Sequence, residues 1–530
     1  MLDRFAGWWA CERKHDAILV LLLASICAAV LALGVPRLVI YGHDVFVALD
    51  GAWRVLNGQR PQVDFYAQMG PVYYLLHAAG IMLAGGDARG LGYGTAIVAV
   101  VLAVWSFLLL RGRMTVIPCI LACVVLVLLA VAPFPLGMEP WYTSFSMKHN
   151  RYGFALTGLI FLECFLPPPD TRRRRFGGAL SSGLACAVLL FLKISYGMVA
   201  LVLVAVSVLL RSGKRLRLAG FLAGIVCFTL PTLAWLRFDL AALAREYGSL
   251  ATAQQPRFTA PIILWRFYLD RFEILPVALL AVLTALLPGV PRRRALALLS
   301  ATVLAIGGGT LLILGNTQAR DVPLMMMLAL LLVNELTGVL RVRAQPQVAV
   351  LLSFGLLAIA IPGTLDASGL ALALWSKLRP PSHDYCFREE HLQALRFADL
   401  NDAEFRNDNG RPFVQNTEEG IDLVRAWGKP DESVRGLGMS NPFSFALLRR
   451  PAHGGAVALA PTDISPGNVP PLAMLVGDAD LLLLPKFPAS ARQTLRLVLS
   501  KYPQLLGKSY TRIAESPEWE LYRRTGAAVR

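Results

Sequence analysis

Apolar and polar positions alternate along this chain in blocks about as long as a membrane span. Nearly uncharged runs of roughly 20 residues recur through the first two thirds of the sequence, and short polar or basic segments separate them. Only 16% of the residues are charged, whereas soluble proteins carry about 25%. The pattern predicts a polytopic α-helical membrane protein. We expect about eleven transmembrane helices, at residues 17–35, 92–110, 116–135, 152–168, 178–192, 196–210, 218–236, 273–289, 295–314, 323–340 and 347–363.

Basic clusters separate the apolar runs and set the expected orientation. The positive-inside rule is satisfied throughout if every cluster faces the cytoplasm. We therefore expect a multi-pass protein of the plasma (inner) membrane, with a cytoplasmic N-terminus and an extracytoplasmic (periplasmic) C-terminal part. The clusters lie at Arg111 and Arg113, Arg172 to Arg175, Arg211 to Arg217, Arg292 to Arg294, and Arg341 and Arg343.

The same rule decides two ambiguous segments. Residues 71–85 are apolar but number only about 15, and a crossing there would move two basic clusters to the outer face. We expect this segment to lie on the outer surface as an amphipathic juxtamembrane helix. Residues 177–210 would form one helix about 50 Å long, so we expect two short helices that turn near Lys193.

The C-terminal part differs from the rest in charge. Residues 364–530 carry 20 basic and 19 acidic residues, whereas residues 1–363 carry 31 and 16. Of the net charge of +16, +15 therefore belongs to the membrane part, which disfavours nucleic acid binding. We expect a transmembrane domain at 1–363, with a first outer loop at 36–91 that holds juxtamembrane helices, and an extracytoplasmic domain at 364–530.

Periodicity in the C-terminal part predicts a small α/β domain. Its apolar positions follow helical spacing in some segments and form short continuous runs, typical of buried strands, in others. We expect helices at residues 420–429 and 490–502, and strands at 455–460 and 479–487 and in a pair at 510–524.

The first outer loop carries three aspartates, Asp44, Asp50 and Asp64, and so places acid next to the first span. Asp50 either faces water or pairs with Arg54 at i+4. Asp44 either begins a helix as a structural residue or acts as the general base for an acceptor hydroxyl or amine.

Cations near the outer ends of the spans are exceptions to the charge rule. Each either reaches to the interface, pairs with a loop acid, or holds an anionic ligand such as a lipid phosphate. The acids of the first loop favour the anionic ligand. His149 could be a base or a ligand, but no second histidine is spaced to join it in a metal site. The candidate cations are Arg54, Lys148, Arg151, Lys193, Arg257, Arg266 and Arg320.

The stretch HDVFVALDGAWRVLNGQRPQVDFYAQMGPVYYLL, residues 43–76, resembles the first outer loop of the GT-C superfamily. These membrane glycosyltransferases use polyprenyl-phosphate sugars and include protein O-mannosyltransferases and the aminoarabinose transferases of lipid A. In that loop an aspartate follows the first span, a helix leads to a glycine turn, and a proline begins a juxtamembrane helix. Asp44, Gly58, Asp64 and Pro71 occupy those positions here.

The resemblance implies a GT-C-like fold and transfer of a sugar from a polyprenyl-phosphate donor to a glycan, lipid or protein acceptor at the outer face of the membrane. It implies an inverting mechanism with Asp44 as the catalytic base. We assign no metal ligand and no cofactor beyond the donor, and a divalent metal requirement stays open. Asp50, Asp64, Arg54, Tyr66 and Gln68 would support the first loop, and Lys148, His149, Arg151, Lys193, Arg257 and Arg320 would bind the donor phosphate.

Two other classes of function are compatible with the composition. A lipid-linked saccharide transporter or polymerase-type envelope protein would carry its key charges in the middle of spans, where few lie. A non-catalytic membrane scaffold would use the C-terminal domain to bind a partner. The sequence favours the glycosyltransferase, with membrane lipids and the lipid-linked sugar as its partners.

Overall fold

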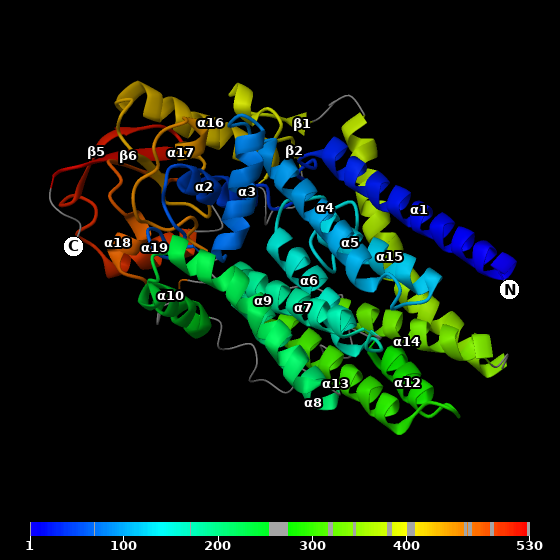
Figure 1. Cartoon of the computed structure of the whole chain (residues 1–530). Helices are drawn as coiled ribbons and strands as arrows, with labels where there is room; N and C mark the ends of the chain where they lie inside the picture. The colour runs from blue at the N-terminus through cyan, green and yellow to red at the C-terminus, as the bar shows by residue number, and fades with distance from the viewer. Residues whose placement is uncertain are drawn as a thin grey trace.

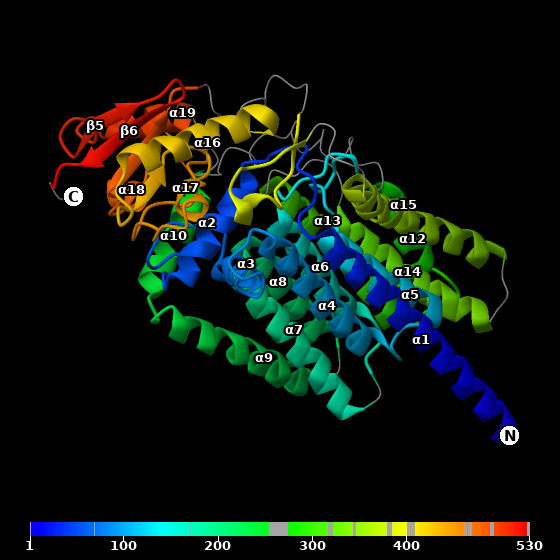
Figure 2. The same cartoon turned by 90° about the horizontal axis from the view of Figure 1, so that it is seen from above.

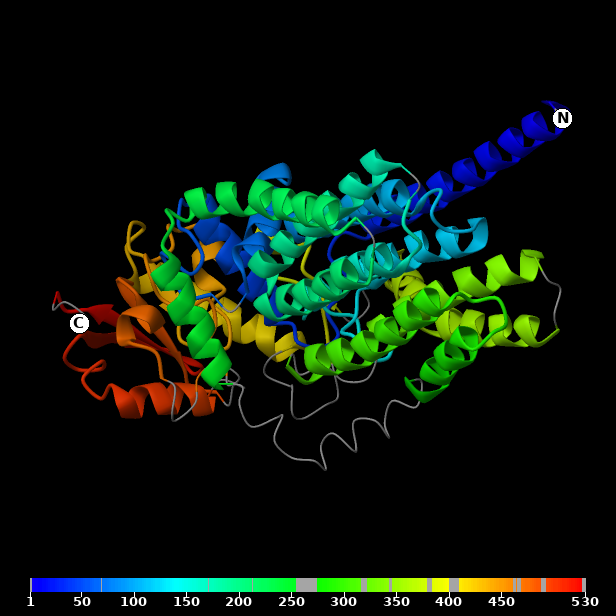
Figure 3. The same ribbon diagram turned by 60° about the horizontal axis from the view of Figure 1, so that its bottom comes forward.

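The chain folds into a bundle of helices with an α/β domain at one end. In Figures 1 and 3 the N-terminus and the C-terminus lie at opposite ends of the molecule. The bundle end beside the C-terminal domain is termed the domain end below. The computed structural model describes residues 2–67, 69–169, 171–211, 213–253, 274–315, 322–342, 346–378, 384–399, 409–460, 464, 469–487 and 492–526.

Each of the eleven predicted spans coincides with a helix in the described part of the chain. Seven of these helices are long and apolar enough to cross a membrane, and three more are shorter apolar helices. Their lengths and composition identify a multipass membrane protein. The eleven helices are α1 (Leu2–Leu33), α4 (Gly90–Leu110), α5 (Val116–Val131), α6 (Lys148–Phe165), α7 (Arg172–Leu192), α8 (Ile194–Leu210), α9 (Lys214–Trp235), α12 (Ile274–Ala285), α13 (Arg292–Gly315), α14 (Pro323–Val342) and α15 (Pro346–Leu378).

Helices α7 and α8 form a hairpin. α7 ends at Leu192, α8 begins at Ile194, and Lys193 between them has an extended backbone with φ −162°. The thiol of Cys186 donates to the carbonyl oxygen of Gly197 across 3.8 Å, although the two residues are eleven positions apart. A continuous helix would separate them by about 16 Å. The chain therefore turns back at Lys193, which confirms the predicted pair of short helices.

Arginines from three segments that are far apart in the sequence meet at the C-terminal end of α6. Arg113, which follows α4, donates to the carbonyl oxygen of Glu163 across 3.0 Å. Arg217 in α9 forms an ion pair with the Glu163 carboxylate, and Arg294 in α13 donates to the carbonyl oxygen of Phe165. Cations are favourable there because the last carbonyls of a helix carry partial negative charge. These clusters share one end of the bundle, termed the basic end, and its cytoplasmic location stays a prediction.

Helix α3 (Pro71–Leu83) lies at the domain end and does not cross the bundle. Before its first turn, the Gly70 amide donates to the carbonyl oxygen of Leu192 at the α7–α8 turn. After its last turn, the Ala88 amide donates to the carbonyl oxygen of His391 in the C-terminal domain. The helix runs at an angle to α4 (Figure 1). Both of its ends are thus held on one side of the bundle, as the charge pattern predicts.

The expected amphipathic character of α3 is wrong. Its histidine, His77, is fully buried, and the ring packs edge-on against Tyr73 and Phe145 at centroid distances of 4.6 and 5.3 Å. The apolar Met82 and Leu83 are exposed instead. The polar position faces protein, and apolar side chains cover the outward surface as well, which suits a helix that borders lipid.

The C-terminal domain is built on a four-stranded mixed sheet in the order β3–β4–β6–β5. β3 and β4 are parallel, and the other neighbours are antiparallel. Two predicted helices and the strands at 479–487 and 510–524 are confirmed. Figure 2 shows α16 lying along the domain beside β5 and β6. The elements are β1 (Asp384–Tyr385), β2 (Phe397–Ala398), α16 (Gly410–Trp427), β3 (Val434–Gly436), α17 (Phe443–Ala446), α18 (Leu472–Val476), β4 (Leu481–Pro485), α19 (Arg492–Lys501), β5 (Tyr510–Glu515) and β6 (Trp519–Arg524).

Residues 455–460 do not form the predicted strand of this sheet. Ala456 makes an isolated bridge with Tyr66 of the first loop, where the Tyr66 amide donates to the carbonyl oxygen of Gly455 and the Val457 amide donates to that of Tyr66. The run is apolar because it is buried between the first loop and the domain. Its pairing partner lies almost 400 positions earlier, which local periodicity cannot reveal.

Candidate active site

Asp44 is the first residue of α2 (Asp44–Leu56), at the domain end of the bundle. An acid is favourable there because the N-terminus of a helix carries partial positive charge. Its Oδ1 lies 3.1 Å from Nε2 of His43, and the Ser146 hydroxyl donates to the same carboxylate. The Asp44 side chain is 27% exposed, whereas that of His43 is 5% exposed. The carboxylate is held in place yet can be reached by another molecule.

Opposing effects set the pKa of Asp44. Burial raises this pKa, but the charge on His43 and hydrogen bonds from His43 and Ser146 lower it by more. The result lies below the ordinary value of 3.8. Asp44 is therefore ionised at neutral pH and can accept a proton.

Lys193 and two residues of α6 form the second part of the site. The Lys193 ammonium donates to Oδ1 of Asn150 across 3.2 Å and lies 3.3 Å from Nε2 of His149. The backbone before α6 is left-handed at Met147, with φ 56°, and this turn directs the first residues of α6 toward the α7–α8 hairpin. Lys193 is half-buried at the hairpin tip. The hairpin therefore brings a cation to the start of α6.

Tyr73 of α3 connects the two parts of the site. Its ring packs edge-on against that of His149, with the centroids 5.6 Å apart. Burial raises the pKa of the Tyr73 hydroxyl well above its ordinary value, and the charge on Asp44 is among the neighbours that add to this shift. Asp44, Tyr73 and the His149–Lys193 pair thus belong to one region, assembled from α2, α3, α6 and the α7–α8 hairpin.

Lys148 and Arg151 are held by backbone carbonyls and an acid. The Lys148 ammonium donates to the carbonyl oxygens of Val131 and Ala132, where α5 ends. The Arg151 guanidinium donates to carbonyl oxygens at the same helix end and to Oδ1 of Asp366 across 2.9 Å. Both side chains are buried. They close the C-terminal end of α5, where cations are favourable.

Asp50 and Arg54 lie on the face of α2 that packs on the C-terminal domain. Of the two alternatives for Asp50, the i,i+4 pair with Arg54 is the one observed, and both side chains are fully buried. Arg54 also donates to the carbonyl oxygens of Ala452 and Gly454. These residues fix α2 to the domain. None of these bonds involves the Asp44 carboxylate.

Asp64 and Tyr66 stabilise the turn that follows α2. Asp64 accepts two hydrogen bonds from the Arg60 guanidinium, at 2.7 and 2.9 Å, and one from the Arg60 amide. Tyr66 pairs through its backbone with residues 455–457. Gln68, Arg257, Arg266 and Arg320 lie outside the described residues.

The sequence did not point to His43, Ser146, Tyr73 or Asn150. His43 is adjacent to the candidate base, and Asn150 follows the KH pair of residues 148–149, but neither position carries a motif. Ser146 and Tyr73 reach the site only because distant segments meet there. No group of three histidine, cysteine, aspartate or glutamate side chains suited to a metal ion occurs among the described residues.

Comparison with known proteins gives matches among solved structures. No protein-family model and no curated protein matches the sequence. The apo crystal structure of ArnT from Cupriavidus metallidurans matches with a TM-score of 0.50 and 15% identity, over 96% of this chain and 98% of that chain. A structure of the same protein bound to undecaprenyl phosphate gives 0.46 and 14% over the same shares. ArnT is a GT-C glycosyltransferase.

The chain has the same overall fold as ArnT. The match with ArnT extends over almost the whole length of both proteins, so it includes the C-terminal domain as well as the bundle. The predicted fold class, a polytopic helical protein with a small α/β domain, is confirmed. At 15% identity the likeness concerns the fold, and the chemistry must be argued from the residues of this chain.

Proposed function

We propose that this protein transfers a sugar from a polyprenyl-phosphate carrier to an acceptor hydroxyl or amine at the outer face of the plasma (inner) membrane. The observation that carries the proposal is that Asp44 acts on the Tyr73 hydroxyl while Lys193 lies beside His149, whose ring packs on Tyr73, at the domain end of a GT-C-like fold. A base and a cation are the two groups that such a transfer requires. The proposed site lies where the lipid carrier would leave the bilayer.

Asp44 acts as the general base. The acceptor oxygen or nitrogen attacks the anomeric carbon of the sugar and gives its proton to the Asp44 carboxylate. The bond between that carbon and the phosphate oxygen breaks, and its electron pair leaves with the polyprenyl phosphate. Attack from the face opposite the phosphate inverts the anomeric configuration. His43 and Ser146 orient the carboxylate and keep it ionised before the reaction.

Lys193 stabilises the negative charge that develops on the departing phosphate. Its ammonium is placed by the amide of Asn150 and the imidazole of His149. His149 positions the lysine and lies beside the same phosphate. Lys148 and Arg151 have a structural role in this proposal, because carbonyl oxygens and Asp366 take up their hydrogen bonds. Arg257 and Arg320 remain candidate phosphate ligands.

The transporter alternative gains no support from the charges in the described spans. Glu163 lies at the basic end and is paired with Arg217. Asp366 is paired with Arg151, which lies at the domain end. Charges along a substrate path would be expected in the middle of spans and open to the path. These charges lie toward one end or the other of the bundle, and each is paired with an opposite charge.

An assay with lipid-linked sugars tests the proposal. The purified protein is given mannosyl- and aminoarabinosyl-phosphoprenols with a membrane extract as the source of acceptors, and release of polyprenyl phosphate is measured by mass spectrometry. Asp44→Asn should reduce turnover by about 10²–10⁴-fold, as loss of a general base does. Asp64→Asn is the matched control, because Asp64 holds the turn through Arg60. Equal turnover in the parent and Asp44→Asn would reject the assignment of the base, and an inactive parent with every donor would reject the transfer.

A further inference from the structure

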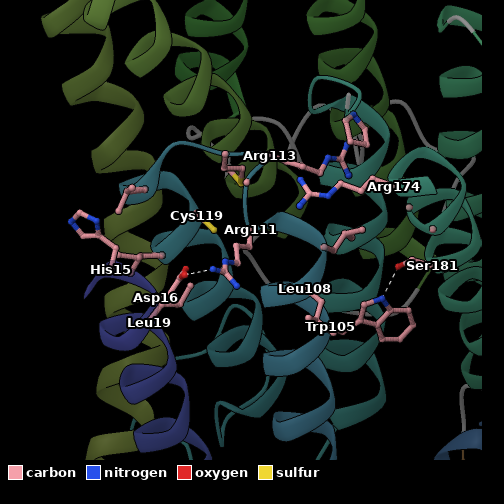
Figure 4. Close-up of a pocket in the computed structure, with 18 residues that line it drawn as sticks. His15, Asp16, Leu19, Trp105, Leu108, Arg111, Arg113, Cys119, Arg174 and Ser181 are labelled. Atoms are coloured by element: carbon pink, nitrogen blue, oxygen red, sulfur yellow. Dashed lines mark hydrogen bonds and ion pairs between the residues drawn. The ribbon is translucent and has the colours of Figure 1, made fainter. Parts of the chain in front are cut away.

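A cavity of about 920 Å³ lies at the basic end, far from the candidate active site. It is lined by residues of α1, α4, α5 and α7 and of the α4–α5 turn (Figure 4). The proposed transfer reaction makes no use of this cavity. Its lining has two distinct parts, one strongly basic and the other apolar.

Three arginines supply the basic part. Arg111 and Arg113 flank Gly112 in the α4–α5 turn, and Gly112 has φ +73°, a conformation that favours glycine. Arg174 comes from the first turn of α7 and reaches that turn, because a Cβ built on Gly112 would lie 3.7 Å from its Nη1. Figure 4 shows the three side chains around the same opening, with Arg111 joined to Asp16.

Acidic groups do not balance this charge. Asp16 is the only carboxylate that lines the cavity in the described chain, and it is already paired with Arg111. Arg113 is 5% exposed and its Nη1 lies 3.7 Å from Oε1 of Glu163, a carboxylate that also serves Arg217. The buried Nε of Arg113 has no hydrogen-bond partner among the described residues. An unpaired buried donor beside a second arginine leaves a place for an anion.

The other walls of the cavity are apolar and open toward the lipid. Leu19, Leu109 and Ile120 line it together with Leu108, which is 71% exposed on the surface of α4. Trp105 closes one side, and its Nε1 donates to Oγ of Ser181 across 2.6 Å. Apolar walls would contribute nothing to the binding of a small soluble anion. An amphipathic ligand would place its anionic group on the arginines and its chain along α4.

We propose that this cavity binds an anionic membrane phospholipid, with the phosphate on Arg111, Arg113 and Arg174 and an acyl chain along Leu108. Basic pockets between transmembrane helices on the cytoplasmic side are suited to such headgroups. The bound lipid neutralises the arginines that α4 and α7 bring together, and so connects the two helices. This inference concerns the end of the bundle opposite the active site and does not depend on the transfer reaction.

Native mass spectrometry of the purified full-length chain tests this binding. The probes are phosphatidylglycerol, which is anionic, and phosphatidylcholine, which is zwitterionic. Arg174→Gln removes an exposed cation that lines the cavity, and Arg173→Gln is the matched control, since Arg173 is equally exposed on the same turn but does not line it. We expect the parent and Arg173→Gln to retain phosphatidylglycerol alike, and Arg174→Gln to bind it about tenfold more weakly. The double variant Arg111→Gln/Arg174→Gln should lose the preference over phosphatidylcholine altogether.

Three results would overturn the proposal. Equal retention by Arg174→Gln and Arg173→Gln would show that the cavity does not hold the phosphate. Equal retention of the two lipids by the parent would show an apolar groove without headgroup recognition. Full displacement of phosphatidylglycerol by millimolar inorganic phosphate would show a site for a soluble anion. Melting curves confirm that each variant is folded, so that weaker binding is not the result of unfolding.

Discussion

Asp50 and Arg54 form an ion pair in which both side chains are fully buried, with Oδ2 and Nε 2.9 Å apart. Both partners also bond to the C-terminal domain: Asn441 donates to Oδ1 of Asp50 across 2.9 Å, and Arg54 donates to the carbonyl oxygens of Ala452 and Gly454. Since α2 begins at the proposed base, the position of that base depends on residues about 400 positions away. The C-terminal domain therefore acts in the proposed reaction as a support for the first loop.

Breaking this ion pair should destabilise the protein strongly. Asp50→Asn leaves the Arg54 guanidinium buried without a compensating charge, which typically costs about 3–5 kcal/mol. Thermal unfolding of the purified protein in detergent measures the loss as a large fall in melting temperature. Asp422→Asn is the control, because Asp422 pairs with Arg388 at the surface, where both side chains are more than half exposed, and such pairs contribute little. A fall no larger than that of Asp422→Asn would contradict the role assigned to the pair.

Helix positions and the pair on α2 could be predicted because their signals are local. Apolar runs mark the spans, an i,i+4 spacing brings Asp50 next to Arg54, and the length of residues 177–210 requires a break near Lys193. The basic clusters then decide which segments cross the membrane, and this placed α3 on one side of the bundle. Each of these features follows either from residues a few turns apart or from the length and flanking charge of a whole span.

The rest depends on contacts between distant segments. No local pattern indicates that Lys148 and Arg151 donate hydrogen bonds to the end of α5. The carbonyl oxygens that accept these bonds are free of helical partners only because α5 ends there. Arg435 on β3 is another case: it is fully buried, and burial first, then the charge on Arg54, lowers its pKa to about 9. A sequence shows an arginine at this position but not the low-dielectric environment created by the first loop.

The pH dependence of turnover should report the pKa of Asp44. Since the pKa in the folded protein is lowered, the base stays ionised through neutral and weakly acidic pH, and turnover falls only as the pH drops below the ordinary value of 3.8. His43→Gln removes the neighbouring charge that lowers this pKa, so the pKa rises and the acid limb of the profile moves to higher pH. The profile of kcat/KM against pH for both proteins measures the shift.

A second histidine provides the control for this profile. His453 lies 3.7 Å from Asp64 and is 61% exposed, so His453→Gln changes the charge near another acid of the same loop. The acid limb of the His453→Gln profile should coincide with that of the parent. If His43→Gln also left the limb in place, or if both variants moved it equally, the limb would not belong to Asp44.

Cysteine labelling should place the two ends of the bundle on opposite sides of the membrane. Cys386 is exposed in the C-terminal domain, and Arg173 is exposed at the basic end. With Cys11 replaced by serine, a membrane-impermeant maleimide should label Cys386 in right-side-out vesicles only. In the Cys386→Ser background, Arg173→Cys should be labelled in inside-out vesicles only. The reverse pattern would invert the proposed orientation, and labelling of both positions from one side would refute an odd number of spans.

Lys193 should contribute to donor binding more than any other cation tested at the domain end. Lys193→Ala removes the ammonium proposed to contact the phosphate, while its neighbours Asn150 and His149 stay in place. Titration with polyprenyl phosphate, the common product of all such donors, should show binding weaker by about 1.5–3 kcal/mol, which is roughly 10–150-fold. Turnover should also fall, because negative charge on the phosphate increases as the glycosidic bond breaks.

Lys148→Ala is the matched control for this last experiment, since it removes the ammonium of the residue immediately before His149, which has a structural role. Its ammonium donates to the carbonyl oxygens of Val131 and Ala132, so its loss should lower the melting temperature while the folded protein binds polyprenyl phosphate as the parent does. The opposite outcome, weak binding in Lys148→Ala and normal binding in Lys193→Ala, would move the phosphate to the end of α5. That result would require the Lys148 side chain to exchange its carbonyl partners for the ligand, and Lys193 would then serve only to fix the α7–α8 hairpin against α6.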